Sequence, residues 1–330
     1  MAWRVAITAL LAAIVALLLW DRDRVLDVLA PQTPHDAYLR SLTAAGLADS
    51  ALVRDWVAAG ERALREPAPA AVPLDTTLRH AVSEPQAYGY RLALKRGRVL
   101  KTTLQVEGTA TAQVFIDLFR ISDTGAPEHV TSAKKGVHAL EHEVRRDGVY
   151  IMRIQPELLR GGPLRIVQRT TAALSFPVAG RDVSSVRSYF RDPRDGGRRE
   201  HHGVDIFAPR DTPVLAASSG LVTSVGTNRL GGNVVWVWDP ARRQSQYYAH
   251  LSRQSVNTGE RVDAGDVIGY VGNTGNARGT PPHLHFGIYA FREGPIDPLP
   301  FVSGATGPQP RRDASAAGEK PAHDNTGSGG

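Results

Sequence analysis

The stretch Arg199-Glu-His-His-Gly-Val-Asp205 opens a region of about 85 residues that also holds Tyr247-Tyr-Ala-His-Leu251 and Pro281-Pro-His-Leu-His-Phe286. Together these segments supply His201, Asp205, His250, His283 and His285. A catalytic zinc ion takes three protein nitrogen or oxygen ligands and keeps a fourth position for water. Two imidazoles and one carboxylate meet that requirement, and the other two histidines are available for proton transfer. The spacing therefore predicts a zinc hydrolase site.

Short apolar runs broken by glycine and proline, such as 205–209 and 212–216, predict strands around these segments. On a strand, residues two apart project from the same face, so His283 and His285 would lie side by side. One imidazole can then bind a metal while its neighbour reaches the substrate. His202 competes with His201 as a ligand, and Gly203 would let the backbone bend enough to bring both ends of the segment to one ion.

Residues 175–302 resemble the M23 metallopeptidases, the LytM and lysostaphin-like cell-wall endopeptidases. The resemblance is carried by four motifs and by a series of glycines: His-x-Gly-x-Asp (201–205), Ala-Pro-x-x-Thr-Pro-Val (208–214), Tyr-Ala-His-Leu (248–251), His-Leu-His-Phe (283–286), and Gly259, Gly265, Gly269 and Gly272. It implies a mostly antiparallel β domain with an open groove and one Zn²⁺ ion.

Carried over residue by residue, the resemblance implies that His201, Asp205 and His285 hold the zinc ion. His283 would be the general base that takes a proton from the zinc-bound water. His250 would hydrogen-bond the developing oxyanion or help to orient that water. The His-x-Gly-x-Asp register favours His201 over His202 as the ligand.

Composition restricts the other possibilities. The chain has no cysteine, which excludes thiol nucleophiles, thiolate zinc sites and disulfides. Its net charge of +6 and pI of about 9.7 favour an anionic partner, such as the bacterial cell wall. Basic residues interleaved with aromatics and a helix-turn-helix pattern are both missing, so a nucleic acid is not indicated.

The N-terminus predicts export. Val5 to Trp20 is an apolar run, broken only by Thr8, between Arg4 and a charged segment, and it lacks a small-x-small cleavage site. We therefore expect residues 1–24 to be a signal anchor in the membrane, with a cleaved signal peptide as the alternative. The rest of the chain would lie on the periplasmic side of the inner membrane or in the cell envelope.

Periodicity divides the remaining sequence. Residues 33–66 are typical of a helical hairpin with a cap at Asp49 or Ser50, and prolines 67, 69 and 73 read as a linker. Alternating apolar residues between glycines predict a small antiparallel β-sandwich over 88–171. The tail, 303–330, has no apolar run and is expected to be disordered. The expected fold is thus mainly β, with an N-terminal helical segment and an accessory sandwich before the catalytic domain.

Three alternative functions fit the sequence less well. Some M23-like domains lack zinc ligands and activate cell-wall amidases, but this chain keeps all five site residues. A lipoyl-type carrier needs a lysine on a turn, and the C-terminal domain has none. The glycines between Gly272 and Gly279 precede a strand and no lysine follows, which argues against nucleotide binding. The sequence predicts a zinc endopeptidase of peptidoglycan, with cell-wall or division proteins as further partners.

Overall fold

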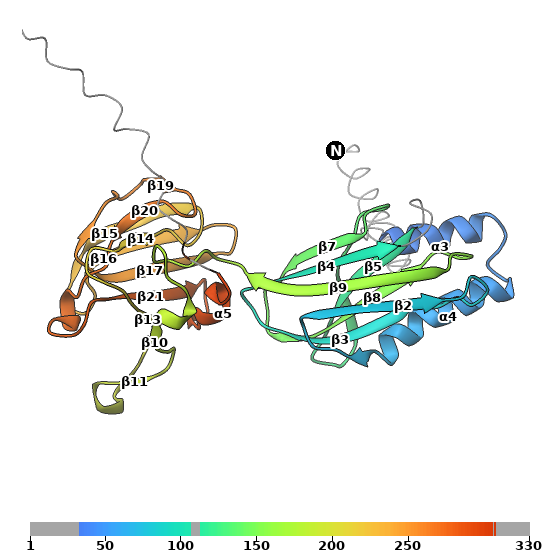
Figure 1. Ribbon diagram of the computed structural model, residues 1–330, viewed down its shortest axis with the longest axis horizontal. Coiled ribbons are helices and arrows are strands. Elements are labelled where there is room, and N and C mark those ends of the chain that lie inside the picture. The colour runs from blue at the N-terminus through green and yellow to red at the C-terminus, as the bar shows by residue number, and fades with distance from the viewer. Residues whose placement is uncertain (1–32, 107–112, 306, 308–330) are drawn as a thin grey trace, which may run out of the picture.

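The computed structural model describes residues 33–106, 113–305 and 307 (Figure 1). Its strands are almost all antiparallel, which confirms the mainly β fold class. The expected signal segment, 1–24, and nearly all of the expected tail lie outside the described residues. Among the described residues, 33–106, 113–305 and 307, no helix combines the length and the apolar character needed to cross a membrane.

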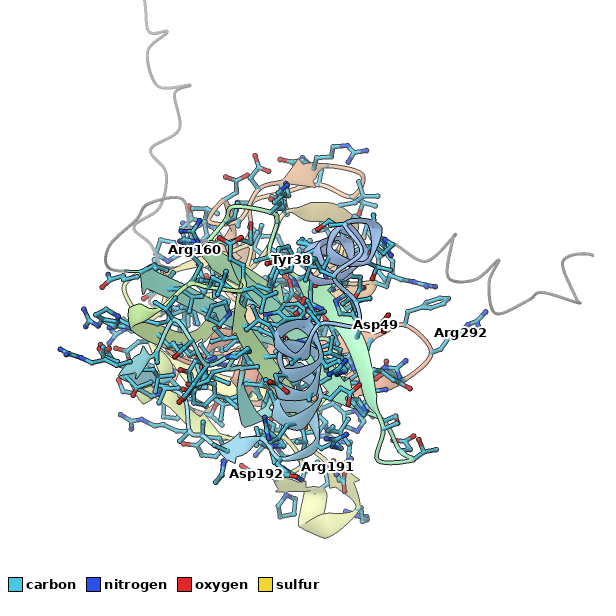
Figure 2. All side chains as sticks on the ribbon, turned by 90° about the vertical axis from the view of Figure 1, so that its right-hand side faces the viewer. Tyr38, Asp49, Arg160, Arg191, Asp192 and Arg292 are labelled. Carbon is cyan, nitrogen blue, oxygen red and sulfur yellow. The ribbon has the colours of Figure 1, made fainter. Side chains whose placement is uncertain are left out.

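Two helices form the N-terminal part of the described chain: α3 (Pro34–Ala44) and α4 (Ala51–Arg65). The side chains of Thr33 and Ser50 cap them by accepting a backbone N–H of the first turn. Trp56 on α4 is buried, and its indole N–H donates to the carbonyl of Pro156 at 2.8 Å. Seen from this end of the molecule, the helices lie in front of the sheets (Figure 2). The helical segment predicted from the sequence is present.

A two-sheet sandwich follows, with strand orders β1-β3-β8-β5-β6 and β2-β9-β4-β7. Its strands are β1 (Ala68–Pro69), β2 (Leu74–His80), β3 (Tyr88–Leu94), β4 (Arg98–Val106), β5 (Val114–Ile121), β6 (Pro127–Ser132), β7 (Ala139–Glu143), β8 (Gly148–Pro156) and β9 (Gly162–Ala172). Alternate residues of β4, such as Leu100 and Leu104, point into the core between the sheets. Strand β2 precedes the expected start of the sandwich and pairs with β9 along its whole length.

The C-terminal part is built on a sheet of order β10-β13-β21-β17-β16-β15-β19, with β22 added beside β21. Sheets β14-β20-β18 and β11-β12 complete it. The strands are β10 (Val186–Ser188), β11 (Pro193–Arg194), β12 (Arg199–Glu200), β13 (Val204–Phe207), β14 (Pro213–Leu215), β15 (Gly220–Asn228), β16 (Gly232–Asp239), β17 (Gln244–Leu251), β18 (Arg253–Gln254), β19 (Arg261–Val262), β20 (Val267–Tyr270), β21 (His283–Ala290) and β22 (Gly294–Ile296), and helix α5 (Leu299–Val302) follows. A second hydrophobic core lies between the large sheet and β14-β20-β18. The β11–β12 hairpin projects from this body (Figure 1).

Polar and apolar contacts join the sandwich to the C-terminal part. The Arg242 guanidinium donates to both carboxylate oxygens of Glu143 at 2.9 Å and to Asp239 at 2.9 Å. The ring of Phe301 packs so closely on Gly97 that a Cβ there would lie 2.5 Å from it. These contacts fix one end of the sandwich against the turn between β16 and β17 and against α5.

Candidate metal centre and active-site groove

Strand register brings the predicted site residues together. Asp205 on β13 pairs directly with His285 on β21, and Phe207 pairs with His283. On the other side of β21, Ala249 of β17 pairs with His285. His283 and His285 are two residues apart on one strand, so they share a face, as the sequence indicated.

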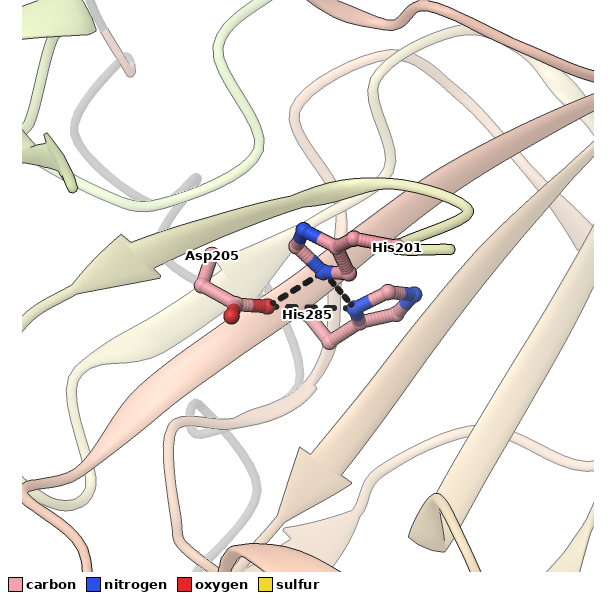
Figure 3. Close-up of side chains that lie close together, drawn as sticks. All are labelled: His201, Asp205 and His285. Atoms are coloured by element: carbon pink, nitrogen blue, oxygen red, sulfur yellow. Dashed lines mark hydrogen bonds and ion pairs between the residues drawn. The ribbon is translucent and has the colours of Figure 1, made fainter. Parts of the chain in front are cut away.

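His201, Asp205 and His285 form one cluster of potential ligand atoms (Figure 3). His201 Nε2 lies 2.9 Å from His285 Nδ1 and 3.0 Å from Asp205 Oδ1, and His285 Nδ1 lies 3.1 Å from the same oxygen. Ligands at zinc distances of about 2.0–2.1 Å in a tetrahedron would be about 3.3 Å apart. The three atoms therefore have nearly the separation that a tetrahedral metal site requires.

The hydrogen bonds around the cluster also fit a cation. His201 Nδ1 donates its proton to the carbonyl of Tyr189 at 2.8 Å, which leaves the Nε2 of the neutral ring without a proton. That lone pair then faces the Asp205 carboxylate and His285 Nδ1. The lone pair is repelled by the negative charge of the carboxylate. A cation between the three atoms would attract all of them. A zinc ion fits the residues present.

Burial and charge set the protonation of two of these residues. Asp205 is only 8% exposed, and burial favours its neutral form. The neighbouring His201 and His285 rings nevertheless hold the pKa of Asp205 well below its usual range. Burial, opposed by the hydrogen bond to Asp205, lowers the pKa of His285. An ionised carboxylate beside neutral imidazoles is the state that binds a metal ion.

His250 and His283 lie next to this cluster. Their ring centroids are 5.0 Å apart, and that of His250 lies 5.9 Å from that of His285. Nδ1 of His250 donates to the carbonyl of Thr274 and Nδ1 of His283 to that of Pro281, each at 2.9 Å. Burial, together with the charges of His285 and His283, lowers the pKa of His250 to about 4. Both rings are thus held by backbone carbonyls.

The backbone of His250 has an unusual conformation. Its φ is +63°, a left-handed value that few residues other than glycine adopt. The end of β17 is nevertheless held, because the His250 N–H donates to the carbonyl of Gly231 at 2.7 Å. Such conformations often occur where a side chain must be aimed at a functional site.

All five predicted residues line one groove of about 590 Å³. His202 also lines it, but its side chain is exposed and lies outside the three-residue cluster. Trp236, Tyr247 and Tyr289 form an aromatic wall on one side, where Tyr247 meets the edge of His285 at 5.8 Å. On another side, Phe207 stacks on His283 with 5.0 Å between ring centroids.

The backbone bends at Gly203, as the sequence indicated, and the position is also tightly packed. A Cβ at this position would lie 2.5 Å from the carbonyl oxygen of Phe286 and 2.8 Å from the His285 ring. The close approach of Phe286 and His285, rather than a left-handed φ, therefore requires glycine here.

Sequence reasoning missed three residues that support the cluster. Arg194 Nη2 lies 2.7 Å from Asp205 Oδ2, and the Ser188 hydroxyl lies 2.6 Å from the same nitrogen. The carbonyl of Tyr189 orients His201. Arg194 is one of many arginines in the chain, so its residue type did not single it out. Every residue has a backbone carbonyl, so no motif could indicate the role of Tyr189.

Comparison with known proteins gives a family for this part of the chain. Residues 199–298 match the profile of Peptidase family M23. The L-Ala–D-Glu endopeptidase of Bacillus subtilis is 39% identical over 139 residues, which is 39% of this chain and 42% of that protein. The peptidoglycan DD-endopeptidase ShyC of Vibrio cholerae is 40% identical over 119 residues, 35% of this chain and 26% of that protein. The match thus spans less than half the length of these relatives.

Among solved structures, the catalytic domain of lysostaphin from Staphylococcus simulans is 38% identical to this chain. The match covers 35% of this chain and 89% of that domain, with a TM-score of 0.32.

Proposed function

From the Peptidase family M23 domain that the chain carries at residues 199–298, we propose that the protein is a zinc-dependent endopeptidase that hydrolyses peptide bonds of bacterial peptidoglycan. The observation that carries the proposal is the convergence of His201, Asp205 and His285 beside two further histidines in one groove. The names of the matched relatives, which describe endopeptidases and in one case peptidoglycan, support the substrate.

His201, Asp205 and His285 would hold the zinc ion. When bound there, zinc supplies a water that ionises near neutral pH and a Lewis acid for the scissile carbonyl. The exposed groove admits an extended peptide, and the aromatic wall of Trp236 and Tyr247 offers it an apolar surface.

His283 is assigned as the general base. Its Nδ1 proton is committed to the carbonyl of Pro281, so Nε2 of the neutral ring carries a lone pair and can accept a proton from the attacking water. The resulting imidazolium can then donate that proton to the leaving amine. Stacking against Phe207 holds the ring in place.

His250 is assigned to the orientation of the water. Its Nδ1 proton is committed to Thr274, and its pKa of about 4 keeps the ring neutral at neutral pH, so Nε2 is a hydrogen-bond acceptor. An acceptor can position a water molecule but cannot donate to an oxyanion. This favours the second of the two roles that the family resemblance implied for His250.

The other parts of the chain are assigned to delivery and placement. Residues 1–24 would act as a signal anchor or signal peptide, which places the enzyme in the cell envelope. The helical hairpin 33–66 and the sandwich 88–171 would be spacer or docking domains, with cell-wall or division proteins as partners, ahead of the catalytic domain 175–302 and the tail 303–330.

The test is mass spectrometry of the material that the purified full chain releases from isolated peptidoglycan, with and without a zinc chelator. We expect peptide-containing fragments whose release stops with the chelator, and their masses will identify the bond cleaved. The His285→Ala variant is the control for contaminating hydrolases. No release by the folded, zinc-loaded protein from walls of several types would refute the proposal.

A further inference from the structure

Arg194 connects the projecting hairpin to the candidate metal centre. It lies on β11, and its Nη2 donates to Asp205 Oδ2 at 2.7 Å and to the Ser188 hydroxyl at 2.6 Å. The side chain of Asp205 is 11% exposed and that of Arg194 is 30% exposed, so the ion pair is largely shielded from water. Shielding makes a charge-assisted hydrogen bond considerably stronger than an exposed ion pair.

The two oxygens of Asp205 therefore have separate partners. Oδ1 faces His201 and His285, whereas Oδ2 faces the guanidinium. A carboxylate whose second oxygen is held in this way offers a single oxygen to a metal ion. The residue that holds this second oxygen therefore determines how many coordination positions of the metal ion remain for water and substrate.

The Ser188 hydroxyl, which accepts a hydrogen bond from Arg194, is itself held in place. The Ser188 hydroxyl donates to Asp192 Oδ2 at 3.0 Å, and this carboxylate oxygen also accepts the backbone N–H of Tyr189 at 2.7 Å. Tyr189 in turn accepts the Nδ1 proton of His201 through its carbonyl. One hydrogen-bonded chain thus runs from the base of the hairpin, near the labelled Asp192 in Figure 2, to two of the three ligand residues.

We propose that Arg194 is a positioning residue that holds Asp205 as a one-oxygen metal ligand and ties the groove-lining β11–β12 hairpin to the metal centre. The inference rests on the proposed zinc site. The hairpin lines the groove, so a substrate that displaces the hairpin would also move Arg194. The hydrogen bond between Arg194 and Asp205 would then change.

The experiment measures metal binding by the full chain in mild detergent, stripped of metal and titrated with zinc against a chromophoric chelator. We expect Arg194→Gln to weaken zinc binding by about 10- to 100-fold, the usual cost of losing a partner of a metal ligand. Arg194→Lys, which keeps one charged donor, should recover part of this loss. Arg199→Ala is the matched control: Arg199 lies on the same hairpin and pairs with Asp195, not with a ligand, so zinc affinity should stay unchanged.

Cobalt spectra separate positioning from a general loss of structure. In Co²⁺-loaded Arg194→Gln, Asp205 can bind through both oxygens, so the visible absorption should weaken as the coordination number rises, while the spectrum of Arg199→Ala stays that of the wild type. Circular dichroism of the metal-free proteins checks that each variant is folded. Equal zinc affinity and identical cobalt spectra for wild type and Arg194→Gln would overturn the inference while leaving the zinc site intact. A wild-type protein that binds no zinc would instead refute the proposed function on which the inference rests.

Discussion

The substitution Gly203→Ala adds one methyl group beside the candidate metal centre. The new Cβ would lie 2.5 Å from the carbonyl oxygen of Phe286, whereas ordinary contacts begin at 3.4 Å, so the two must separate by about 0.9 Å. The carbonyl cannot move alone, because Phe286 is paired with Val204 on β13 and with Tyr248 on β17. Overpacking of this kind costs about 1–3 kcal/mol of the free energy of unfolding.

Metal affinity should fall by more than stability alone suggests. The same Cβ would lie 2.8 Å from Cε1 of His285, and moving the ring to 3.4 Å requires a shift of about 0.6 Å. Metal–ligand distances are tolerated only within about 0.2 Å of their usual values. We therefore expect zinc binding to weaken by about 10- to 100-fold, the range found when the surroundings of a ligand are altered.

Chelator competition and thermal unfolding of the metal-free and zinc-loaded proteins measure the two effects. Gly226→Ala on β15 is the matched control, since a Cβ there meets no atom within 4 Å. That variant should keep both the zinc affinity and the unfolding temperature of the wild type. If Gly203→Ala binds zinc as tightly as Gly226→Ala, the role assigned to Gly203 is wrong.

Three further predictions concern the site and the junction. His285→Ala should abolish zinc binding and activity, whereas His283→Ala should keep most of the zinc and lose roughly 10²–10⁴-fold in rate, the usual contribution of a general base; equal zinc loss in both, measured by elemental analysis, would contradict the assigned roles. Removing zinc from the wild type should lower the free energy of unfolding by about 2.7 kcal/mol relative to a sample with zinc at 100 times its Kd, and a melting temperature indifferent to chelator would argue against a bound ion. Arg242→Ala leaves the buried Asp239 without its cation and should lower the free energy of unfolding by about 3 kcal/mol, which unfolding by urea measures. Limited proteolysis should show faster cleavage between the sandwich and the C-terminal part.

Sequence periodicity predicted the fold where the chain alternates cleanly. On β4, Leu100, Thr102 and Leu104 alternate with exposed residues, and all three are buried as the spacing indicates. Strand β2 was not foreseen, because Leu74–His80 follows three prolines and mixes polar with apolar residues. What makes it a strand is β9, to which it pairs over seven residues far away in the sequence. Tertiary pairing outweighed the local signal there.

The candidate site likewise has some features that the sequence predicts and others that it does not. The placement of His283 and His285 on one face follows from the geometry of a strand, whichever fold surrounds it. The tautomers of His201, His250 and His283 follow instead from the carbonyls of Tyr189, Thr274 and Pro281, each supplied by a loop. Any residue has a carbonyl, so no residue type at those positions could have predicted the contact.

The positive φ of His250 is another feature that the sequence does not predict, and it has a chemical consequence. The left-handed φ occurs one residue before the end of β17, where the His250 ring faces the carbonyl of Thr274. The carbonyl of Thr274 then fixes the tautomer, and the tautomer makes Nε2 an acceptor. A sequence can therefore predict that a histidine is present at the site, but whether it accepts or donates a proton depends on which loop carbonyl the backbone turns it toward. The proposed choice between the two roles of His250 therefore rests on the carbonyl of Thr274 and not on the sequence.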